Sequence, residues 1–216
     1  MKRYDTVIFD MDGTLLNTLE DLTDSVNYML DKYSYPTKTI EQIKSYVGNG
    51  IKLLVERAIP DGAKNPQFDE AFECFRSHYA LHSEDKTKAY DGVVELIAKF
   101  KKNGYKMAIV SNKFDEGLKA LANKFFPDVD VAIGESAGVN KKPAPDMVYA
   151  AMEQLGSCKE KSVYIGDSDV DFMTAKNSGI DCVSVLWGFR DREFLSSLGA
   201  TVFAETPEQV FEIVNG

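Results

Sequence analysis

The sequence predicts an α/β protein, a doubly wound parallel sheet with an inserted helical domain. Short apolar runs rich in valine and isoleucine recur along the chain, as in strands buried on both faces of a parallel sheet. Helical patterns separate these runs, and this alternation is typical of doubly wound sheets. One long segment breaks the alternation, because residues 17–88 show helical patterns and no convincing strand.

Five runs are expected to form the sheet, at residues 5–10, 105–110, 129–133, 162–165 and 182–185. A helix is expected to start near Val93, because apolar residues from there to Phe100 share one stripe, and Asn103-Gly104 is a helix-ending signal. Further helices are expected at 115–124, 146–155 and 169–178. Prolines before Asp146 and Gly179 after Ser178 mark two of their ends.

The inserted segment carries three apolar stripes at helical spacing. They begin near Leu22, Ile51 and Phe68, and Asn65-Pro66 is a helix-start signal before the third. We therefore predict a sheet domain formed by residues 1–16 and 89–216, and a helical domain formed by 17–88.

Composition narrows the classes of partner. The formal net charge of -9 argues against nucleic acid and anionic membranes, although one positive pocket could still bind a small anion. No apolar run is long enough to cross a bilayer, and the first residues lack the apolar stretch of a signal peptide. The three cysteines have no zinc or CxxC spacing and are expected to be reduced, mostly buried thiols. We expect a cytoplasmic protein, monomeric or homodimeric.

Polar residues follow three of the predicted strands. The first, second and fourth strands end on Asp10, Ser111 and Asp167. Because ligands bind at the carboxyl ends of strands in an open α/β sheet, these side chains should converge. With Asp12 and Asp171 nearby, four carboxylates would crowd one site and need a cation. An all-oxygen site of this kind favours Mg²⁺.

A lysine would complete a phosphate site beside Ser111 and the metal. Lys142 is the preferred residue, because Pro143 restrains it to an extended backbone at the end of a loop. Lys141 is the rival for this role, and either lysine could simply be a solvated loop residue.

These motifs in this order resemble the haloacid dehalogenase-like (HAD) superfamily. The residues are Asp10-Met11-Asp12-Gly13-Thr14-Leu15, Ser111-Asn112-Lys113, Lys142-Pro143 and Gly166-Asp167-Ser168-Asp169-Val170-Asp171. The order and spacing are similar to phosphatases with a helical cap after the first motif. Val47-Gly48-Asn49-Gly50 and Trp187-Gly188-Phe189-Arg190 resemble the phosphoglycolate phosphatases. One departure is Ala89-Tyr90-Asp91-Gly92, where relatives often carry proline.

The resemblance implies a role for each motif. Asp10 would attack phosphorus and form an aspartyl-phosphate, and Asp12 would act as general acid and then base. Mg²⁺ would be held by the Asp10 carboxylate, the Asp12 backbone carbonyl and Asp167, with Asp171 supporting. Ser111 and Lys142 would bind the phosphoryl group. Apart from the resemblance, Asn112 and Lys113 are expected to offer a backbone amide to the phosphate and not a catalytic side chain.

Several alternatives stay open at this point. The substrate could be 2-phosphoglycolate, pyrophosphate, a nucleotide or a sugar phosphate, and a sugar phosphomutase uses the same chemistry. A dehalogenase is disfavoured because it needs no acid at Asp12, and a phospho-signalling receiver domain would lack both this acid and the helical insertion. Asn49 is a candidate for choosing the substrate, although its glycine-flanked loop could be an ordinary turn.

Some residues have simpler readings as well. Ser111 could cap a helix, and Asp167 and Asp171 could cap the helix after the fourth strand. His78 and His82 lie four residues apart on a predicted helix, but the pair lacks the glutamate of an HExxH motif and a metal role is disfavoured.

Overall fold

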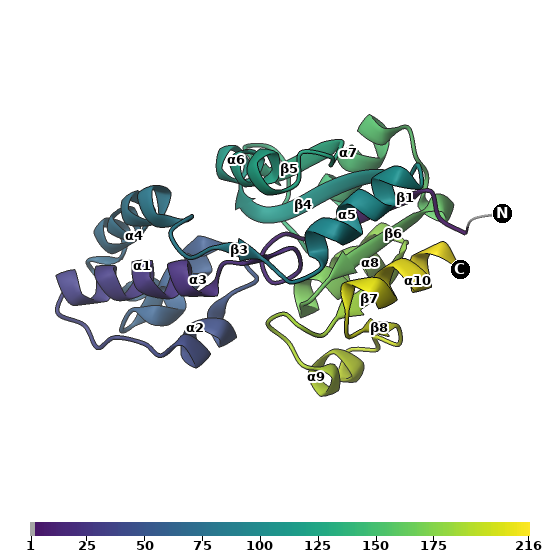
Figure 1. Cartoon of the computed structure of the whole chain (residues 1–216). Coiled ribbons are helices and arrows are strands. Elements are labelled where there is room, and N and C mark those ends of the chain that lie inside the picture. Colours follow the sequence, from purple (N-terminus) through teal and green to yellow (C-terminus); the bar gives the residue numbers. More distant parts are fainter. Residues whose placement is uncertain (1–2) are drawn as a thin grey trace. The chain divides into compact units, whose positions relative to one another are not determined.

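The chain divides into two compact units in the computed structural model, which describes residues 3–216 (Figure 1). The larger unit combines the residues up to Leu16 with Ala89–Gly216, and the smaller unit is Asn17–Lys88. The chain passes between them through two two-residue strands, β2 (Leu16–Asn17) and β3 (Lys88–Ala89), which pair with each other.

A six-stranded sheet of order β5-β4-β1-β6-β7-β8 forms the centre of the larger unit, and its neighbouring strands are parallel. This confirms the predicted fold class. The strands are β1 (Thr6–Phe9), β4 (Lys106–Phe114), β5 (Val131–Glu135), β6 (Ser162–Gly166), β7 (Asp181–Val185) and β8 (Phe203–Ala204).

The order of the strands changes direction at β1. From β1 the chain builds outward through β4 and β5 on one side, and then through β6, β7 and β8 on the other. Phe9, the last residue of β1, pairs with Ile109 of β4 and with Ile165 of β6. Asp10 follows directly, so it lies at the topological switch point, where ligands bind in open α/β sheets.

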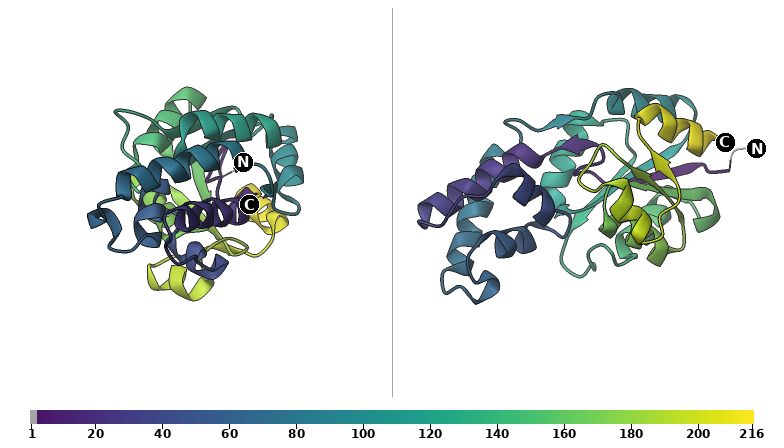
Figure 2. Two further views of the ribbon diagram at one scale, coloured as in Figure 1. Left: turned by 90° about the vertical axis from the view of Figure 1, so that its left-hand side faces the viewer. Right: turned by 90° about the horizontal axis from the view of Figure 1, so that it is seen from below.

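Helices cover both faces of the sheet (Figures 1 and 2). Val7 and Phe9 belong to one buried cluster and Ile8 to another, because successive side chains of a strand point to opposite faces. The first cluster includes α5 (Val93–Lys102), α6 (Asp115–Phe125) and α10 (Pro207–Asn215), and the second includes α7 (Asp146–Leu155) and α8 (Asp169–Ser178). The remaining helical segments are η2 (Lys159–Lys161) and α9 (Arg192–Ser197).

The smaller unit is helical, as the stripes predict. It contains α1 (Leu19–Lys32), α2 (Ile40–Tyr46), α3 (Ile51–Ala58), η1 (Gly62–Lys64) and α4 (Phe68–His82). Its core includes Val26 and Met29 of α1, Val55 of α3 and Phe75 of α4, none of which is exposed.

The helices at 146–155 and 169–178 match their predicted bounds. Strand β4 is longer than predicted, since it passes Ser111 and ends at Phe114. The prediction that the thiols are mostly buried was wrong, because Cys158 is exposed and Cys74 and Cys182 are half-buried, all three as free cysteines. Among residues 3–216 no helix is both long enough and apolar enough to cross a membrane.

Asp21 ties the end of the smaller unit to its first helix. Its buried carboxylate accepts hydrogen bonds from the Lys86 and Thr87 backbone amides, at 2.8–3.1 Å. We expect Asp21→Ala to lower the free energy of unfolding by about 2–3 kcal/mol, because two amides lose a charged acceptor. Urea unfolding followed by circular dichroism measures the loss.

Asp24 provides the matched control on the same helix. Its carboxylate is half-exposed and forms a 2.6 Å ion pair with the Lys86 ammonium. Asp24→Ala should cost less than about 1 kcal/mol, as exposed pairs do. Equal losses in the two variants would contradict the role assigned to Asp21.

Candidate active site

The loop after β1 turns sharply away from the sheet. The Asp10 amide still donates to the Ile165 carbonyl at 2.9 Å, and the Gly13 amide then donates to the Leu16 carbonyl at 2.8 Å. Gly13 has a φ of 92°, in the left-handed region that favours glycine. A Cβ at Gly13 would also lie 2.5 Å from Asp167 Oδ2, so a side chain here would displace the Asp167 carboxylate.

Three buried carboxylates meet at the ends of β1 and β6. Asp10, Asp167 and Asp171 each place an oxygen within 4.8 Å of the others. Asp167 Oδ1 accepts from the Thr14 hydroxyl at 2.9 Å, and its Oδ2 accepts from the Phe189 amide at 2.7 Å. The sequence predicted from the strand ends that Asp10 and Asp167 converge, and it placed Asp171 nearby.

Asp171 comes from the first turn of α8. Its Oδ2 accepts from the Ser168 amide at 3.1 Å and from the Ser168 hydroxyl at 2.5 Å. The Asp171 amide donates back to the Ser168 hydroxyl oxygen at 3.4 Å, which completes a capping box with Ser168 as the N-cap residue. The helix-capping alternative is therefore realised for Asp171, together with its place in the acidic cluster. Since both its oxygens accept hydrogen bonds, Asp171 is suited to orient its neighbours.

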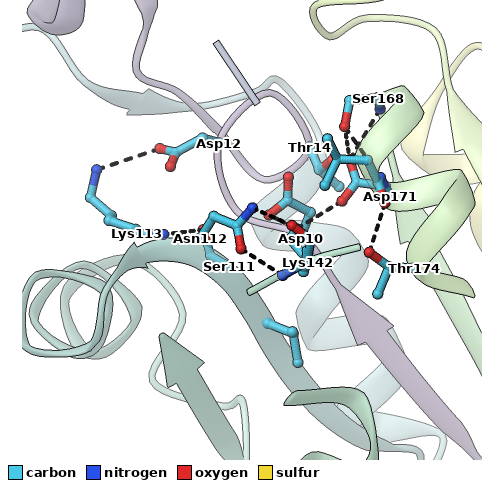
Figure 3. A network of polar contacts seen from close by, with 12 residues as sticks. Asp10, Asp12, Thr14, Ser111, Asn112, Lys113, Lys142, Ser168, Asp171 and Thr174 are labelled. Atoms are coloured by element: carbon cyan, nitrogen blue, oxygen red, sulfur yellow. Dashed lines mark hydrogen bonds and ion pairs between the residues drawn. The ribbon is translucent and has the colours of Figure 1, made fainter. Parts of the chain in front are cut away.

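Lys142 joins this cluster as a buried cation (Figure 3). Its Nζ lies 2.7 Å from Asp10 Oδ1 and 2.8 Å from Asp171 Oδ1, and it donates to the Tyr164 hydroxyl at 3.0 Å. The side chain is only 2% exposed. From this position the Lys142 ammonium can contact a group that is bound at Asp10.

Lys141 lies elsewhere. Its Nζ forms a 2.6 Å ion pair with Glu135 Oε1, and its side chain is 43% exposed. Of the two adjacent lysines, the geometry therefore brings Lys142 and not Lys141 to the carboxylates.

The buried charged groups shift one another's pKa values strongly. Burial and the neighbouring charge of Asp171 raise the pKa of Asp10 well above its usual range, and Lys142 only partly offsets this. Burial and Asp171 likewise raise the pKa of Asp167 to about 7. Burial acts to lower the pKa of Lys142, but Asp10 and Asp171 outweigh it and hold that pKa well above the usual value. Three carboxylates thus face one ammonium.

This donor set fits a hard divalent cation. A cluster of buried carboxylate oxygens with an excess of negative charge matches the oxygen ligands that Mg²⁺ takes. Asp10 and Asp167 are the residues that would supply carboxylate ligands.

The acidic cluster predicts a pH-dependent stability in the presence of chelator. Because the folded state raises the pKa values of Asp10 and Asp167, it favours their protonated forms. These carboxyl groups therefore favour the folded state most below about pH 4, the pKa of an aspartate in the unfolded chain. Their contribution to the free energy of unfolding is lost as the pH rises through about 7, the pKa of Asp167 in the folded state. We expect a lower Tm at pH 8 than at pH 5 in EDTA, and a larger rise on adding Mg²⁺ at pH 8.

Differential scanning fluorimetry of the wild type and Asp167→Asn tests this expectation. The variant should lose much of the pH dependence in EDTA, because it lacks one of the two shifted carboxylates. A wild-type Tm in EDTA that is the same at pH 5 and pH 8 would contradict it.

Residues 111–113 continue β4 with a break in register between Val110 and Phe114. Ser111 is buried, and its hydroxyl accepts from the Lys113 amide at 3.2 Å. The alternative that Ser111 caps a helix was wrong, because α6 starts later and Phe114 occupies its N-cap position.

Asn112 holds the Lys142 loop in place. Its Oδ1 accepts from the Lys142 amide at 2.8 Å, and its Nδ2 donates to the Lys142 carbonyl at 3.0 Å. The side-chain amide thus clamps a backbone segment 30 residues away. The predicted backbone amide to phosphate stays a prediction.

The resemblance implies release of phosphate at this site, and we expect Asn112→Ala to reduce that release by about 10- to 100-fold, because a shift of about 1 Å in a positioned group has an effect of this size. Steady-state kinetics on the best substrate measures the loss. Asn140→Ala is the control, since the Asn140 side chain donates to Asp146, the first residue of α7, and not to the Lys142 backbone. An unchanged rate in Asn112→Ala would show that the clamp is dispensable.

Asp12 departs from the sequence-based expectation. Its carboxylate is not in the acidic cluster, and its Oδ1 lies 3.6 Å from the Lys113 ammonium (Figure 3). The prediction of four converging carboxylates was therefore wrong for Asp12. The loop turn that follows Asp10 directs the Asp12 side chain toward β4.

Sequence reasoning did not assign roles to three residues that contact the cluster. The Thr14 hydroxyl donates a hydrogen bond to Asp167. The Tyr164 hydroxyl accepts one from Lys142 and donates one to Asp171. Ser168 bonds to Asp171. Thr14 and Ser168 lie within the quoted motifs, which was the available signal, whereas Tyr164 looks like an ordinary core residue of a strand.

In the smaller unit, Asn49 is held by an arginine. Arg57 Nη2 donates to Asn49 Oδ1 at 2.7 Å, and Nη1 donates to the Tyr46 carbonyl at 2.6 Å. Gly48 and Gly50 on either side both have positive φ. The loop therefore has a defined conformation.

His78 and His82 lie next to each other on α4. The rings of His78 and His82 stack at 4.3 Å, and their Nδ1 atoms lie at hydrogen-bond distance from Ser25 and Asp85. The groups of potential metal ligands found among the described residues include neither histidine.

Comparison with known proteins matches the sequence to a family. A model described as haloacid dehalogenase-like hydrolase matches residues 7–185. Phosphoglycolate phosphatase 1 of Pseudomonas aeruginosa is 32% identical over 193 residues, which cover 85% of this chain and 70% of that protein. The phosphoglycolate phosphatase of Mesorhizobium japonicum is 31% identical over 191 residues, covering 86% and 84%.

Solved structures share the whole fold. A candidate phosphoglycolate phosphatase from Lactobacillus delbrueckii superposes with a TM-score of 0.95 at 37% identity, over all of both chains. CbbY from Rhodobacter sphaeroides, solved with phosphate, has a TM-score of 0.77 at 23% identity over 96% of each chain, and so shares the fold.

Proposed function

Because the chain belongs to the haloacid dehalogenase-like hydrolases, and its relatives include phosphoglycolate phosphatases, we propose that it is a Mg²⁺-dependent phosphatase of small phosphomonoesters. Its best single substrate is 2-phosphoglycolate. The observation that carries the proposal is Asp10, a buried carboxylate at the switch point of the sheet with the Lys142 ammonium 2.7 Å away.

Asp10 is the nucleophile. One of its carboxylate oxygens bonds to phosphorus while the ester P–O bond breaks, and the electron pair of that bond goes to the leaving oxygen. The Lys142 ammonium, held by Asp10 and Asp171, stabilises the negative charge on the phosphoryl oxygens. Ser111 adds a hydroxyl group to the phosphoryl site.

Asp12 moves the protons. It protonates the leaving oxygen in the first step and takes a proton from water in the second, when water attacks the aspartyl-phosphate and restores Asp10. Its separation from the acidic cluster suits this role, since a group that exchanges protons with the leaving oxygen must not be a metal ligand through its carboxylate.

A bound Mg²⁺ would supply positive charge at the phosphoryl group. The Asp10 and Asp167 carboxylates and the Asp12 backbone carbonyl would hold it. Asp171 orients this set, because its oxygens are already engaged by Ser168 and Lys142.

Residues 1–16 and 89–216 form the catalytic domain, and residues 17–88 form a cap that selects the substrate. Asn49 is the candidate residue for this selection. Because Arg57 occupies its Oδ1, the amide Nδ2 is the group that Asn49 can offer to an acceptor such as a substrate carboxylate.

A phosphate-release assay tests the proposal. The panel contains 2-phosphoglycolate, pyrophosphate, nucleotides and sugar phosphates, each with Mg²⁺ or with EDTA. Mg²⁺-dependent release led by 2-phosphoglycolate supports both mechanism and substrate, whereas release led by another ester keeps the mechanism alone. No release from any ester by folded protein would contradict the proposal and favour phosphoryl transfer between sugars.

A further inference from the structure

Lys113 has a buried side chain beside Asp12, which lies in the loop after β1. The side chain is 8% exposed, and its Nζ lies 3.6 Å from Asp12 Oδ1 (Figure 3). Long charged side chains are seldom buried to this degree without a partner of opposite charge. The ion pair with Asp12 accounts for a buried ammonium at this position.

Asp12 Oδ1 is the other half of the pair. It is buried and has no hydrogen-bond partner among the described residues. At 3.6 Å the Lys113 ammonium attracts it but does not form a hydrogen bond of normal length. Asp12 is therefore held by charge while its oxygen stays available to another polar group.

The backbone explains why Lys113 reaches this position. The break in the register of β4 before Phe114 is accompanied by the hydrogen bond from the Lys113 amide to Ser111. Gly134 of β5 lets the strands approach closely, because a Cβ there would lie 2.7 Å from the Lys113 carbonyl oxygen. The backbone that carries Lys113 is thus fixed by its neighbours.

We propose that Lys113 is a positioning residue that holds the Asp12 carboxylate apart from the acidic cluster and ready for proton transfer to the leaving oxygen. This inference rests on the proposed function. Without Lys113, the Asp12 carboxylate would lose the cation that fixes its place, and proton donation in the first step would suffer. Lys113 would not touch the substrate.

Comparing esters with different leaving groups distinguishes a role of Lys113 in positioning Asp12 from a purely structural role. The oxygen of an alkyl ester needs a proton as its bond to phosphorus breaks, whereas p-nitrophenolate leaves without one. The constant kcat/KM reports the steps up to departure of the leaving group. We expect Lys113→Met to lower kcat/KM by about 10- to 100-fold for the best alkyl ester of the panel, and by less than about threefold for p-nitrophenyl phosphate.

Three further variants make the test specific. Lys113→Arg should restore much of the alkyl-ester activity, because it keeps the positive charge. Adding Lys113→Met to Asp12→Asn should cause no further loss, because the two residues act as one unit. Lys119→Met should change the hydrolysis of neither ester, since the Lys119 side chain is exposed and pairs with Asp115 one turn earlier on α6.

The possible outcomes are distinct. Equal losses for both esters in Lys113→Met would overturn the proposal and indicate a phosphate contact or a structural role. An additive loss in the double variant would also overturn it. A wild-type protein that hydrolyses neither ester would instead contradict the proposed function. The p-nitrophenyl phosphate rate also reports whether each variant has a folded site.

Discussion

Replacing Asp10 by asparagine is expected to reduce phosphate release by at least about 10⁴-fold, since an amide of the same shape is not a nucleophile that can form the acyl phosphate. The same change should raise the Tm in EDTA at pH 8. The pKa of Asp10 is raised well above its usual range by burial and by Asp171, so ionising it destabilises the folded protein at that pH.

Activity and stability should therefore move in opposite directions in Asp10→Asn. A phosphate-release assay and a thermal melt on the same sample measure both. Asp146→Asn is the matched control, because Asp146 is the half-buried first residue of α7, accepts a hydrogen bond from Asn140 and lies outside the group of clustered carboxylates. Loss of activity together with a lower Tm would indicate misfolding instead of loss of the nucleophile.

Replacing Lys142 by methionine should have the largest effect on stability. The ammonium is the cation that lies within 3 Å of both Asp10 and Asp171, and its side chain is 2% exposed. Removing one partner of a buried ion pair costs about 3–5 kcal/mol, because the remaining charges are left uncompensated. Phosphate release should also fall by about 10²–10³-fold, as when one oxyanion-hole donor is removed.

The neighbouring Lys141→Met is a stringent control. Lys141 carries the same charge one residue earlier, but its side chain is 43% exposed and pairs with a single half-buried carboxylate, Glu135, so its removal should cost about 1 kcal/mol. Urea unfolding in EDTA gives both values. Adding Mg²⁺ should recover part of the stability of Lys142→Met, because the cation replaces the missing positive charge. Similar losses in the two variants would contradict the assignment of Lys142.

The strand ends explain why much of the site was predictable. Asp10 and Asp167 follow continuous apolar runs, and the parallel order of β1 and β6 brings such ends together. The lysine was predictable because Pro143 marks the end of a loop. These features depend on local patterns and on one rule about sheets, so a sequence is sufficient for them.

Other features depend on distant backbone geometry. The Asn112 side chain bonds to a backbone segment 30 residues away, and no local pattern indicates that pairing. The direction of the Asp12 side chain depends on the turn after Asp10 and on the irregular end of β4. Helix α2 was missed although Thr39 and Gln42 form a capping box, because the helix has only seven residues.

The paired strands β2 and β3 mean that residues 17–88 leave and re-enter the larger unit at one place. This has a consequence for synthesis on the ribosome. β1 pairs with β4 and β6, whose residues emerge about 100 and 156 positions later, so the central strand has no partner strand until about 100 further residues have been made. The smaller unit is continuous in sequence and is expected to fold first. Until its partner strands are made, the apolar Val7–Phe9 stretch is exposed and can aggregate or be bound by chaperones.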